Sequence, residues 1–215
     1  MQVGKKVRKQ MFPPRLFVTG TDTGVGKTLV SAVLLAGLEG AYWKPIQTGS
    51  VEGTDSQWIR AVTGLDKNRF LPEAYLFAPP VSPHLAARME EKPISIDSIN
   101  VPDVRADHLI IEGAGGVMVP LDEKFFMVDL IKKIGAPVIV VASSRLGTIN
   151  HTLLTLEQLK RKGIEIFGVV MNGPPWPENS RAIEFYGRVK IVAEISPMKP
   201  VTLEKLKSCF KNFSP

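Results

Sequence analysis

The chain has 215 residues, 44% of them hydrophobic, and its single cysteine, Cys209, excludes an internal disulfide and a cysteine-based metal cluster. Four of the six excess positive charges lie on Lys5, Lys6, Arg8 and Lys9, so the net charge does not indicate a nucleic-acid-binding domain. No apolar run approaches the roughly 18 residues of a membrane span, and none follows the basic N-terminus as in a secretory signal.

These bounds predict one domain formed by residues 11–215, long enough to bury a substantial core. We expect the basic residues 1–10 to form a disordered extension, because short charge runs are usually solvated. The lone cysteine is typical of a protein of the reducing cytoplasm, and we expect no binding to membrane or nucleic acid.

Apolar runs rich in β-branched residues recur along the chain and predict strands at residues 15–20, 41–45, 108–116, 136–142, 163–172 and 189–195. Since these runs are apolar throughout, they are typical of strands buried on both faces of a parallel sheet. Helices are expected between them, at residues 27–38, 55–62, 83–91, 127–134, 148–162 and 202–210. Residues 172–180, rich in Pro and Gly, are predicted to be a surface loop.

Alternating strands and helices predict a doubly wound, mostly parallel α/β sheet. In such sheets ligands bind at the carboxyl ends of the strands. The candidate functional residues are therefore those that follow a predicted strand.

The first strand is followed by the segment GTDTGVGKT, Gly20–Thr28, which then opens a helix. It is close to the phosphate-binding pattern G-x-x-x-x-G-K-[ST], but the residue five places before Gly26 is Thr21 rather than glycine. The first amide groups of a helix have no partners inside the helix and favour an anion, so the segment predicts phosphate binding. The alternative is a glycine-rich turn that binds nothing.

Each residue type in this segment suits a nucleotide. Gly24 and Gly26 let the backbone approach phosphate oxygens, Lys27 can bridge the outer phosphates, and the hydroxyl of Thr28 can bind magnesium. The pattern therefore predicts the fold class of P-loop NTP hydrolases.

Three further charged residues are candidates for the same site. Glu112 ends an apolar strand just before a glycine-rich loop, where a carboxylate can hold magnesium directly or through water. Asp55 can supply another oxygen, or it can merely charge or cap a helix N-terminus. Lys44 ends the second strand and either extends to solvent or faces the ligand crevice beside Lys27, which we favour.

Five strings occur in the order GTDTGVGKT, YWKPIQTG, SPHLAA, IIEGAGGVMVPL and GTINHTLLTLE. Together they resemble the dethiobiotin synthetases of biotin biosynthesis, and the likeness extends from about Phe17 to Met198. That family has the same displaced first glycine in its phosphate loop. The resemblance implies an ATP- and magnesium-dependent ligase that carboxylates 7,8-diaminononanoate with carbon dioxide. ATP would phosphorylate the resulting carbamate, and the second amine would close the ring of dethiobiotin.

The resemblance also implies roles for particular residues. Lys27 and Lys44 would be catalytic, the first on the phosphates and the second on the carbamate and the transferred phosphoryl group. Thr28, Asp55 and Glu112 would bind magnesium. The residues implied in ATP binding are Thr23, Gly24, Val25, Gly26, Lys27, Thr28, Asp55, Glu112, Gly113, Ala114, Gly115, Asn172, Gly173, Ser196, Pro197 and Met198. Those implied in substrate binding are Thr48, Gly116, Val117 and Asn150, the last reaching the site of a partner subunit in a homodimer.

Other functions account for fewer of these features. Partition-type switch ATPases share this fold but carry a signature lysine where this chain has Asp22. Amidotransferase-like cobyrinate amidases need an additional glutamine-hydrolysing domain, for which the chain is too short. His84, His108 and His151 have no metal-ligand spacing, and we expect His108 at an exposed strand end.

Overall fold

A computed structural model describes residues 9–215. Most of the predicted basic extension lies outside the described residues; of residues 1–10 only Lys9 and Gln10 are described. In chain order the first half contains β1 (Arg15–Gly20), α2 (Lys27–Leu38), β2 (Ala41–Trp43), β3 (Ile46–Gln47), α3 (Asp55–Thr63), β4 (Phe70–Leu71), β5 (Tyr75–Leu76) and α4 (Pro83–Met89). The second half contains β6 (Leu109–Gly116), α5 (Met127–Ile134), β7 (Val138–Ser143), α6 (Thr148–Arg161), β8 (Ile166–Asn172), α7 (Pro177–Gly187), β9 (Ile191–Ile195) and α8 (Leu203–Phe210).

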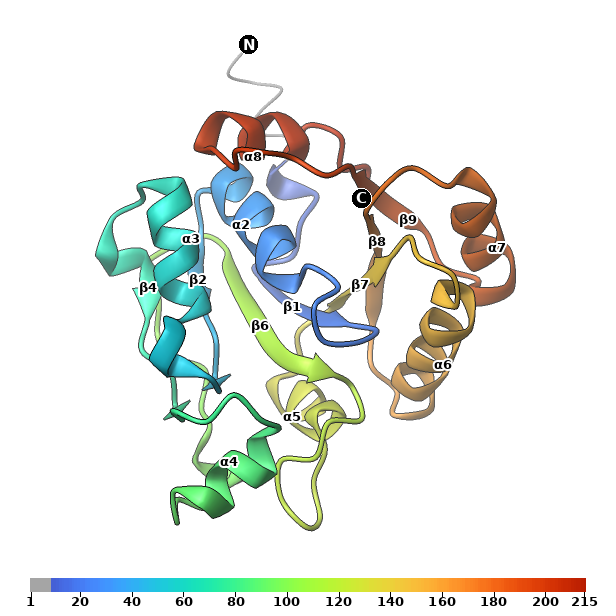
Figure 1. Ribbon diagram of the computed structural model, residues 1–215. Helices are drawn as coiled ribbons and strands as arrows, with labels where there is room; N and C mark the ends of the chain where they lie inside the picture. The colour runs from blue at the N-terminus through green and yellow to red at the C-terminus, as the bar shows by residue number, and fades with distance from the viewer. Residues whose placement is uncertain (1–8) are drawn as a thin grey trace.

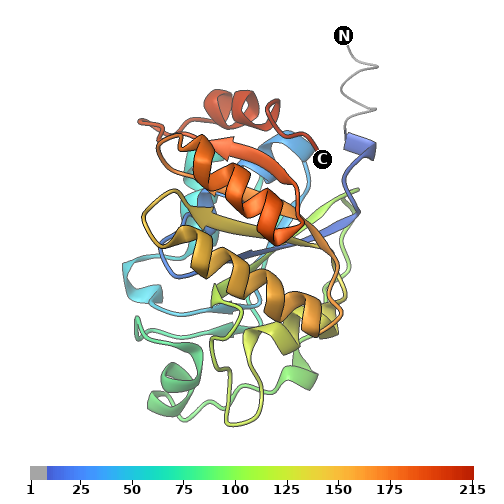
Figure 2. The same cartoon turned by 90° about the vertical axis from the view of Figure 1, so that its right-hand side faces the viewer.

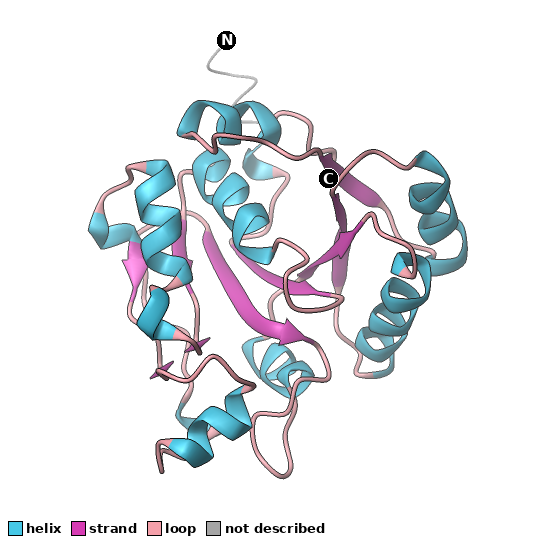
Figure 3. Ribbon diagram, in the orientation of Figure 1, coloured by secondary structure: helices cyan, strands magenta, loops and turns pink. Residues whose placement is uncertain are grey.

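Seven strands form one sheet in the order β4-β2-β6-β1-β7-β8-β9, and neighbouring strands pair in parallel. Helices cover both faces (Figure 1, Figure 3). Apolar residues of α2, α3 and α8 pack on one face, and those of α5, α6 and α7 pack on the other. Figure 2 shows α6 and α7 side by side over the second face. This is the predicted doubly wound, mostly parallel sheet.

The six predicted strands are all present, and the predicted bounds of α2 and α5 match those in the structure. The short strands β3, β4 and β5 escaped prediction because two residues carry no periodicity. The prediction of a surface loop at residues 172–180 was wrong in its second half, because α7 begins at Pro177, a residue favoured in the first turn of a helix. His108 was also placed wrongly: it is buried and its Nδ1 lies 3.1 Å from the backbone oxygen of Pro13.

No helix in the described part of the chain is long and apolar enough to cross a membrane.

Candidate active site

A cavity of about 990 Å³ lies at the carboxyl ends of β1, β2 and β6. This is the edge at which parallel α/β sheets bind ligands. The phosphate-loop segment, the loop after β2, the start of α3 and the end of β6 all contribute to its walls. The predicted site residues that line it together are Thr23, Gly24, Gly26, Lys27, Thr28, Lys44, Thr48, Asp55, Glu112, Ala114 and Gly115.

The segment from Gly20 to Thr28 turns sharply between β1 and α2. Gly24 and Gly26 have φ angles of 74° and 102°, which other residue types rarely adopt. The displaced glycine also has a local reason, because a Cβ atom on Gly20 would lie 2.7 Å from a methyl carbon of Val25. Gly20 therefore lets the loop fold back over the end of its own strand.

Lys27 begins α2 and is buried, and its Nζ donates to the backbone oxygen of Asp22 at 2.9 Å. Burial lowers the pKa of this amine from 10.5 to about 8; the Glu112 charge opposes the shift, and the neighbouring Lys44 adds to it. The amine therefore lies among charged side chains at the opening of a helix, where an anion is favoured.

Glu112 has no exposed surface, although it carries a carboxylate. The Thr28 hydroxyl donates to its Oε1 at 2.9 Å, and the Tyr42 phenol donates to its Oε2, also at 2.9 Å. Because a buried carboxylate is costly without hydrogen bonds, these donors stabilise the charge. Burial raises the pKa of the Tyr42 phenol well above its usual value, and the Glu112 charge raises it further, so the phenol stays protonated as a donor.

Lys44 lies between the two carboxylates of the site. Its Nζ contacts Asp55 Oδ2 directly and lies 3.4 Å from Glu112 Oε1. Burial alone would lower the pKa of this amine, but the charges of Glu112 and Asp55 raise it, and the net shift is upward. Of the two orientations open in the sequence, the structure has Lys44 facing the crevice.

Asp55 is not the cap of α3. That position belongs to Thr54, whose side chain accepts from the backbone N–H of Gln57 at 3.1 Å in a capping box. The side chain of Asp55 is therefore free to pair with Lys44. Its backbone N–H donates to Gln47 Oε1 at 3.1 Å, and Gln47 is buried.

Tyr42 and Gln47 were missed by sequence reasoning. Both are polar groups within an otherwise apolar stretch, two residues before Lys44 and three after it. A polar side chain in an apolar stretch is expected to be buried and to need a hydrogen-bond partner, and this could have indicated both residues as candidates.

The remaining predicted residues lie elsewhere around this edge. Val25, Asn172, Gly173 and Pro197 line a neighbouring cavity of about 360 Å³ on the other side of the phosphate loop. Gly116 and Val117 line a third cavity, and Asn150 lines a fourth on the surface of α6. Gly113, Ser196 and Met198 line none of these cavities.

Asn172 supports the phosphate loop directly. Its Nδ2 donates to the backbone oxygen of Val25 at 2.9 Å. A Cβ atom on Gly26 would collide with this amide group, which gives a second reason for glycine there.

Thr28, Asp55 and Glu112 converge through their contacts with one another and with Lys44. A hydroxyl and two carboxylates are hard oxygen donors of the kind that magnesium prefers. Residues 9–215 contain no group of three or more His, Cys, Asp or Glu side chains that could hold a metal.

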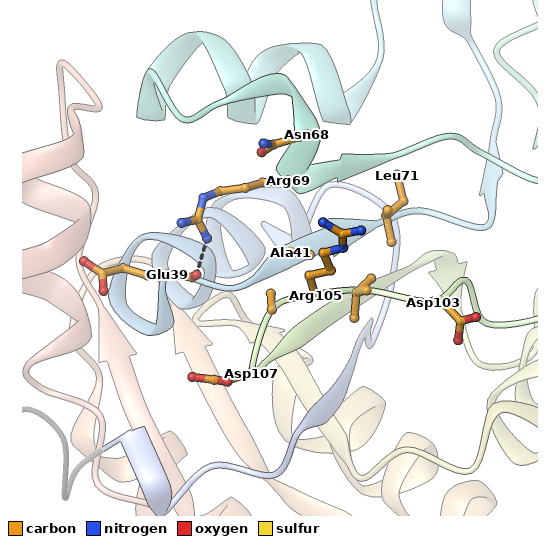
Figure 4. A pocket seen from close by; sticks show the side chains of 10 residues that line it. Glu39, Ala41, Asn68, Arg69, Leu71, Asp103, Arg105 and Asp107 are labelled. Atoms are coloured by element: carbon orange, nitrogen blue, oxygen red, sulfur yellow. Dashed lines mark hydrogen bonds between the residues drawn. The ribbon is translucent and has the colours of Figure 1, made fainter.

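A further cavity, of about 580 Å³, lies near the opposite ends of β2 and β6 (Figure 4). Its charged residues include Arg69, Asp103, Arg105 and Asp107. The guanidinium of Arg69 donates to the backbone oxygens of Glu39 and Gly40, the latter at 2.9 Å, and so binds carbonyl groups at the end of α2.

Comparison with known proteins agrees with this geometry. A family model described as an AAA domain matches residues 14–205. The chain is 50% identical to an ATP-dependent dethiobiotin synthetase of Paramagnetospirillum magneticum, over 87% of this chain and 90% of that protein. It is 45% identical to one from Lawsonia intracellularis, over 90% of this chain and 93% of that protein.

Solved structures resemble the chain in fold. A ParA family ATPase from Chlorobium tepidum has a TM-score of 0.57 and 14% identity, over 93% of this chain and 92% of that one. A putative plasmid partition protein from Borrelia burgdorferi, bound to AMPPNP, has a TM-score of 0.54 and 11% identity, over 94% of this chain and 96% of that one. At this level of identity the likeness concerns the fold alone and does not favour a partition-type function.

Proposed function

Because the chain belongs to the family of ATP-dependent dethiobiotin synthetases, we propose that it performs that reaction in the cavity beside the phosphate loop. The substrates are ATP, carbon dioxide and 7,8-diaminononanoate, and the products are dethiobiotin, ADP and phosphate. One observation carries the proposal: two buried lysines, Lys27 and Lys44, line a single cavity with Glu112 at a phosphate-binding loop.

The phosphate loop binds the nucleotide. Backbone N–H groups at the start of α2 and the Lys27 ammonium face the phosphates. Asn172, Gly173, Ser196, Pro197 and Met198 lie toward the adenine. The hydrogen bond from Asn172 to Val25 supports this placement, because it connects the end of β8 to the loop.

Thr28, Asp55 and Glu112 hold magnesium. When bound, magnesium supplies positive charge to the phosphate oxygens. The donor types and their convergence support this assignment.

Lys44 acts on the group being transferred. One substrate amine combines with carbon dioxide to give a carbamate, whose oxygen then takes the terminal phosphoryl group of ATP. The Lys44 ammonium, kept protonated by the two neighbouring carboxylates, stabilises the negative charge on the carbamate and on the moving phosphoryl group. The second amine then attacks the carbamate carbon, and phosphate leaves as the ring closes.

Thr48, Gly116 and Val117 contact the diamine substrate, and Asn150 contacts its far carboxylate from a second copy of the chain. Asn150 is exposed on α6 and lines a different cavity from Thr48, so a partner subunit accounts for its role better than the same chain does. Two exposed side chains that line the same cavity as Asn150, Leu154 and Tyr186, fit a homodimer interface. We place the enzyme in the cytoplasm, as a single domain at residues 11–215.

A direct assay tests the proposal. Purified protein is incubated with ATP, magnesium, bicarbonate and diaminononanoate, and dethiobiotin is sought by mass spectrometry. We expect dethiobiotin and ADP in equal amounts, with neither formed when the diamine is omitted. ATP hydrolysis without dethiobiotin, stimulated by DNA, would instead favour a partition-type ATPase.

A further inference from the structure

Within residues 9–215, the polar partners of the Glu112 carboxylate are Thr28, Lys44 and Tyr42, and of these only Tyr42 has no part in the proposed mechanism. Its ring has no exposed surface, and its hydroxyl donates to Glu112 Oε2 at 2.9 Å. Tyr42 does not line the cavity, so it cannot meet the nucleotide or the diamine there. The hydrogen bond to Glu112 links this hydroxyl to the residues that line the cavity.

The sheet register brings these two residues together. Tyr42 in β2 pairs with Ile110 in the parallel strand β6. Because side chains alternate between faces along a strand, Glu112 lies on the same face of β6 as Ile110, which packs in one core cluster with Tyr42. Tyr42 therefore contacts Glu112 from the core side, whereas Lys44, two residues later, contacts it from the cavity side.

The two oxygens of Glu112 have different surroundings. Oε1 accepts from Thr28 and lies near Lys44, both of which line the cavity. Oε2 accepts from Tyr42 on the core side. The last torsion of a glutamate side chain is broad, so a hydrogen bond to Oε2 restricts rotation of the carboxylate and keeps Oε1 toward the cavity.

We propose that Tyr42 is a positioning residue that sets the metal affinity of the site by fixing the Glu112 carboxylate from behind. The inference rests on the proposed role of Glu112 in binding magnesium. Its physical basis is general: groups that hydrogen-bond a metal ligand from the outer shell orient it, and their loss weakens metal binding.

The test uses Tyr42→Phe, which removes the hydroxyl and keeps the buried ring in its contact with Phe70. Binding of Mn²⁺ to the protein–ADP complex is followed by electron paramagnetic resonance. We expect the Mn²⁺ affinity to fall by about tenfold or more. Affinity for ADP in the presence of a chelator should stay unchanged, because the phosphate loop is untouched.

Tyr75→Phe is the matched control. Its hydroxyl also makes one hydrogen bond, accepting from the backbone N–H of Ser95 at 2.9 Å, but it lies on β5 away from the carboxylates. The control should keep the wild-type Mn²⁺ affinity.

A double-mutant cycle with Glu112→Gln separates the possible failures. If Tyr42 acts through Glu112, adding Tyr42→Phe to Glu112→Gln changes the Mn²⁺ affinity no further. If the single Tyr42→Phe variant folds poorly, comparing the double variant with Glu112→Gln still answers the question, because neither of these two carries a buried charge at position 112 that loses a donor.

Wild-type Mn²⁺ affinity in Tyr42→Phe, with a weakened affinity in Glu112→Gln, would overturn the role of Tyr42 alone. Unchanged affinity in both variants would overturn the metal role of Glu112 and the inference with it. If Tyr42→Phe lowers the affinity for ADP in the presence of a chelator as much as it lowers the Mn²⁺ affinity, the hydroxyl supports the fold rather than the metal site.

Discussion

The two cavities near opposite ends of β2 and β6 both contain acidic and basic side chains, but these differ in burial. At the carboxyl edge Lys27, Lys44 and Glu112 are buried and bound to one another or to the loop. At the amino edge Asp103, Arg105 and Asp107 are exposed. Arg69, whose hydrogen bond to the backbone oxygen of Glu39 is drawn in Figure 4, binds carbonyl groups at the end of α2.

The two cavities therefore differ in the energetics of their charged side chains. Exposed charges affect the stability of the fold little, whereas buried charges are unfavourable unless they are paired. A buried ion pair often stabilises a protein less than apolar residues of similar volume would. Buried, mutually paired charges in a cleft therefore mark a functional site, whereas the mixed charges of the amino-edge cavity are those of an ordinary surface.

The strongest test of this comparison is Lys44→Ala. We expect turnover to fall by at least about 100-fold, because the lost ammonium stabilises charge that develops during the reaction. Metal-free ADP affinity should change little, since Lys44 does not belong to the phosphate loop. Steady-state rates and calorimetric titration measure the two quantities.

Arg105→Ala at the amino-edge cavity is the control for Lys44, and it should leave both quantities unchanged. Equal losses of turnover and of ADP affinity in Lys44→Ala would contradict its assignment to the transferred group.

Glu112→Gln should have the next largest effect. The amide keeps the size of the side chain but removes its charge, so the magnesium concentration needed for half-maximal rate should rise by at least about tenfold. A magnesium titration of the rate measures this shift. Asp107→Asn removes a carboxylate from the amino-edge cavity and should leave the titration as in the wild type; an unchanged titration in Glu112→Gln would remove the metal assignment.

The pH dependence of nucleotide binding should follow Lys27. With the amine pKa at about 8, its charge is lost as the pH rises through that value, and phosphate binding weakens. One proton allows at most about a tenfold loss of ADP affinity for each pH unit above 8. Titration of ADP in the presence of a chelator, from pH 7 to 10, measures it, and Lys27→Arg should show no such decline.

The same shift has a defined sign for stability. Between about pH 8 and the ordinary lysine value of 10.5, the unfolded chain holds more protons than the folded chain. The contribution of Lys27 to the free energy of unfolding therefore rises with pH in that window.

The smallest effect on activity is expected at the amino edge. Arg69→Ala removes hydrogen bonds to the end of α2 and should lower the free energy of unfolding by about 1–2 kcal/mol. Turnover should stay at the wild-type value. Urea unfolding beside a rate measurement checks both, and a large loss of turnover would mean that the amino edge takes part in function after all.

The sequence by itself determined the six longer strands, most of the helices and the phosphate loop. These depend on local patterns: apolar β-branched runs, helix start and stop residues, and glycines at positive φ. The whole of α7 was missed, because prolines around Trp176 indicate a loop as readily as a helix start.

Only the tertiary structure decided which charges meet. Tyr42 and Glu112 are 70 residues apart and touch because β2 and β6 pair in one particular register. The sequence left open whether Asp55 caps a helix or supplies an oxygen to the site. In the structure Thr54 caps α3, and the side chain of Asp55 pairs with Lys44 instead. The orientation of Lys44 likewise depends on two carboxylates from distant segments. A local pattern specifies the conformation of its own segment, but a buried charge is placed by partners that arrive through folding.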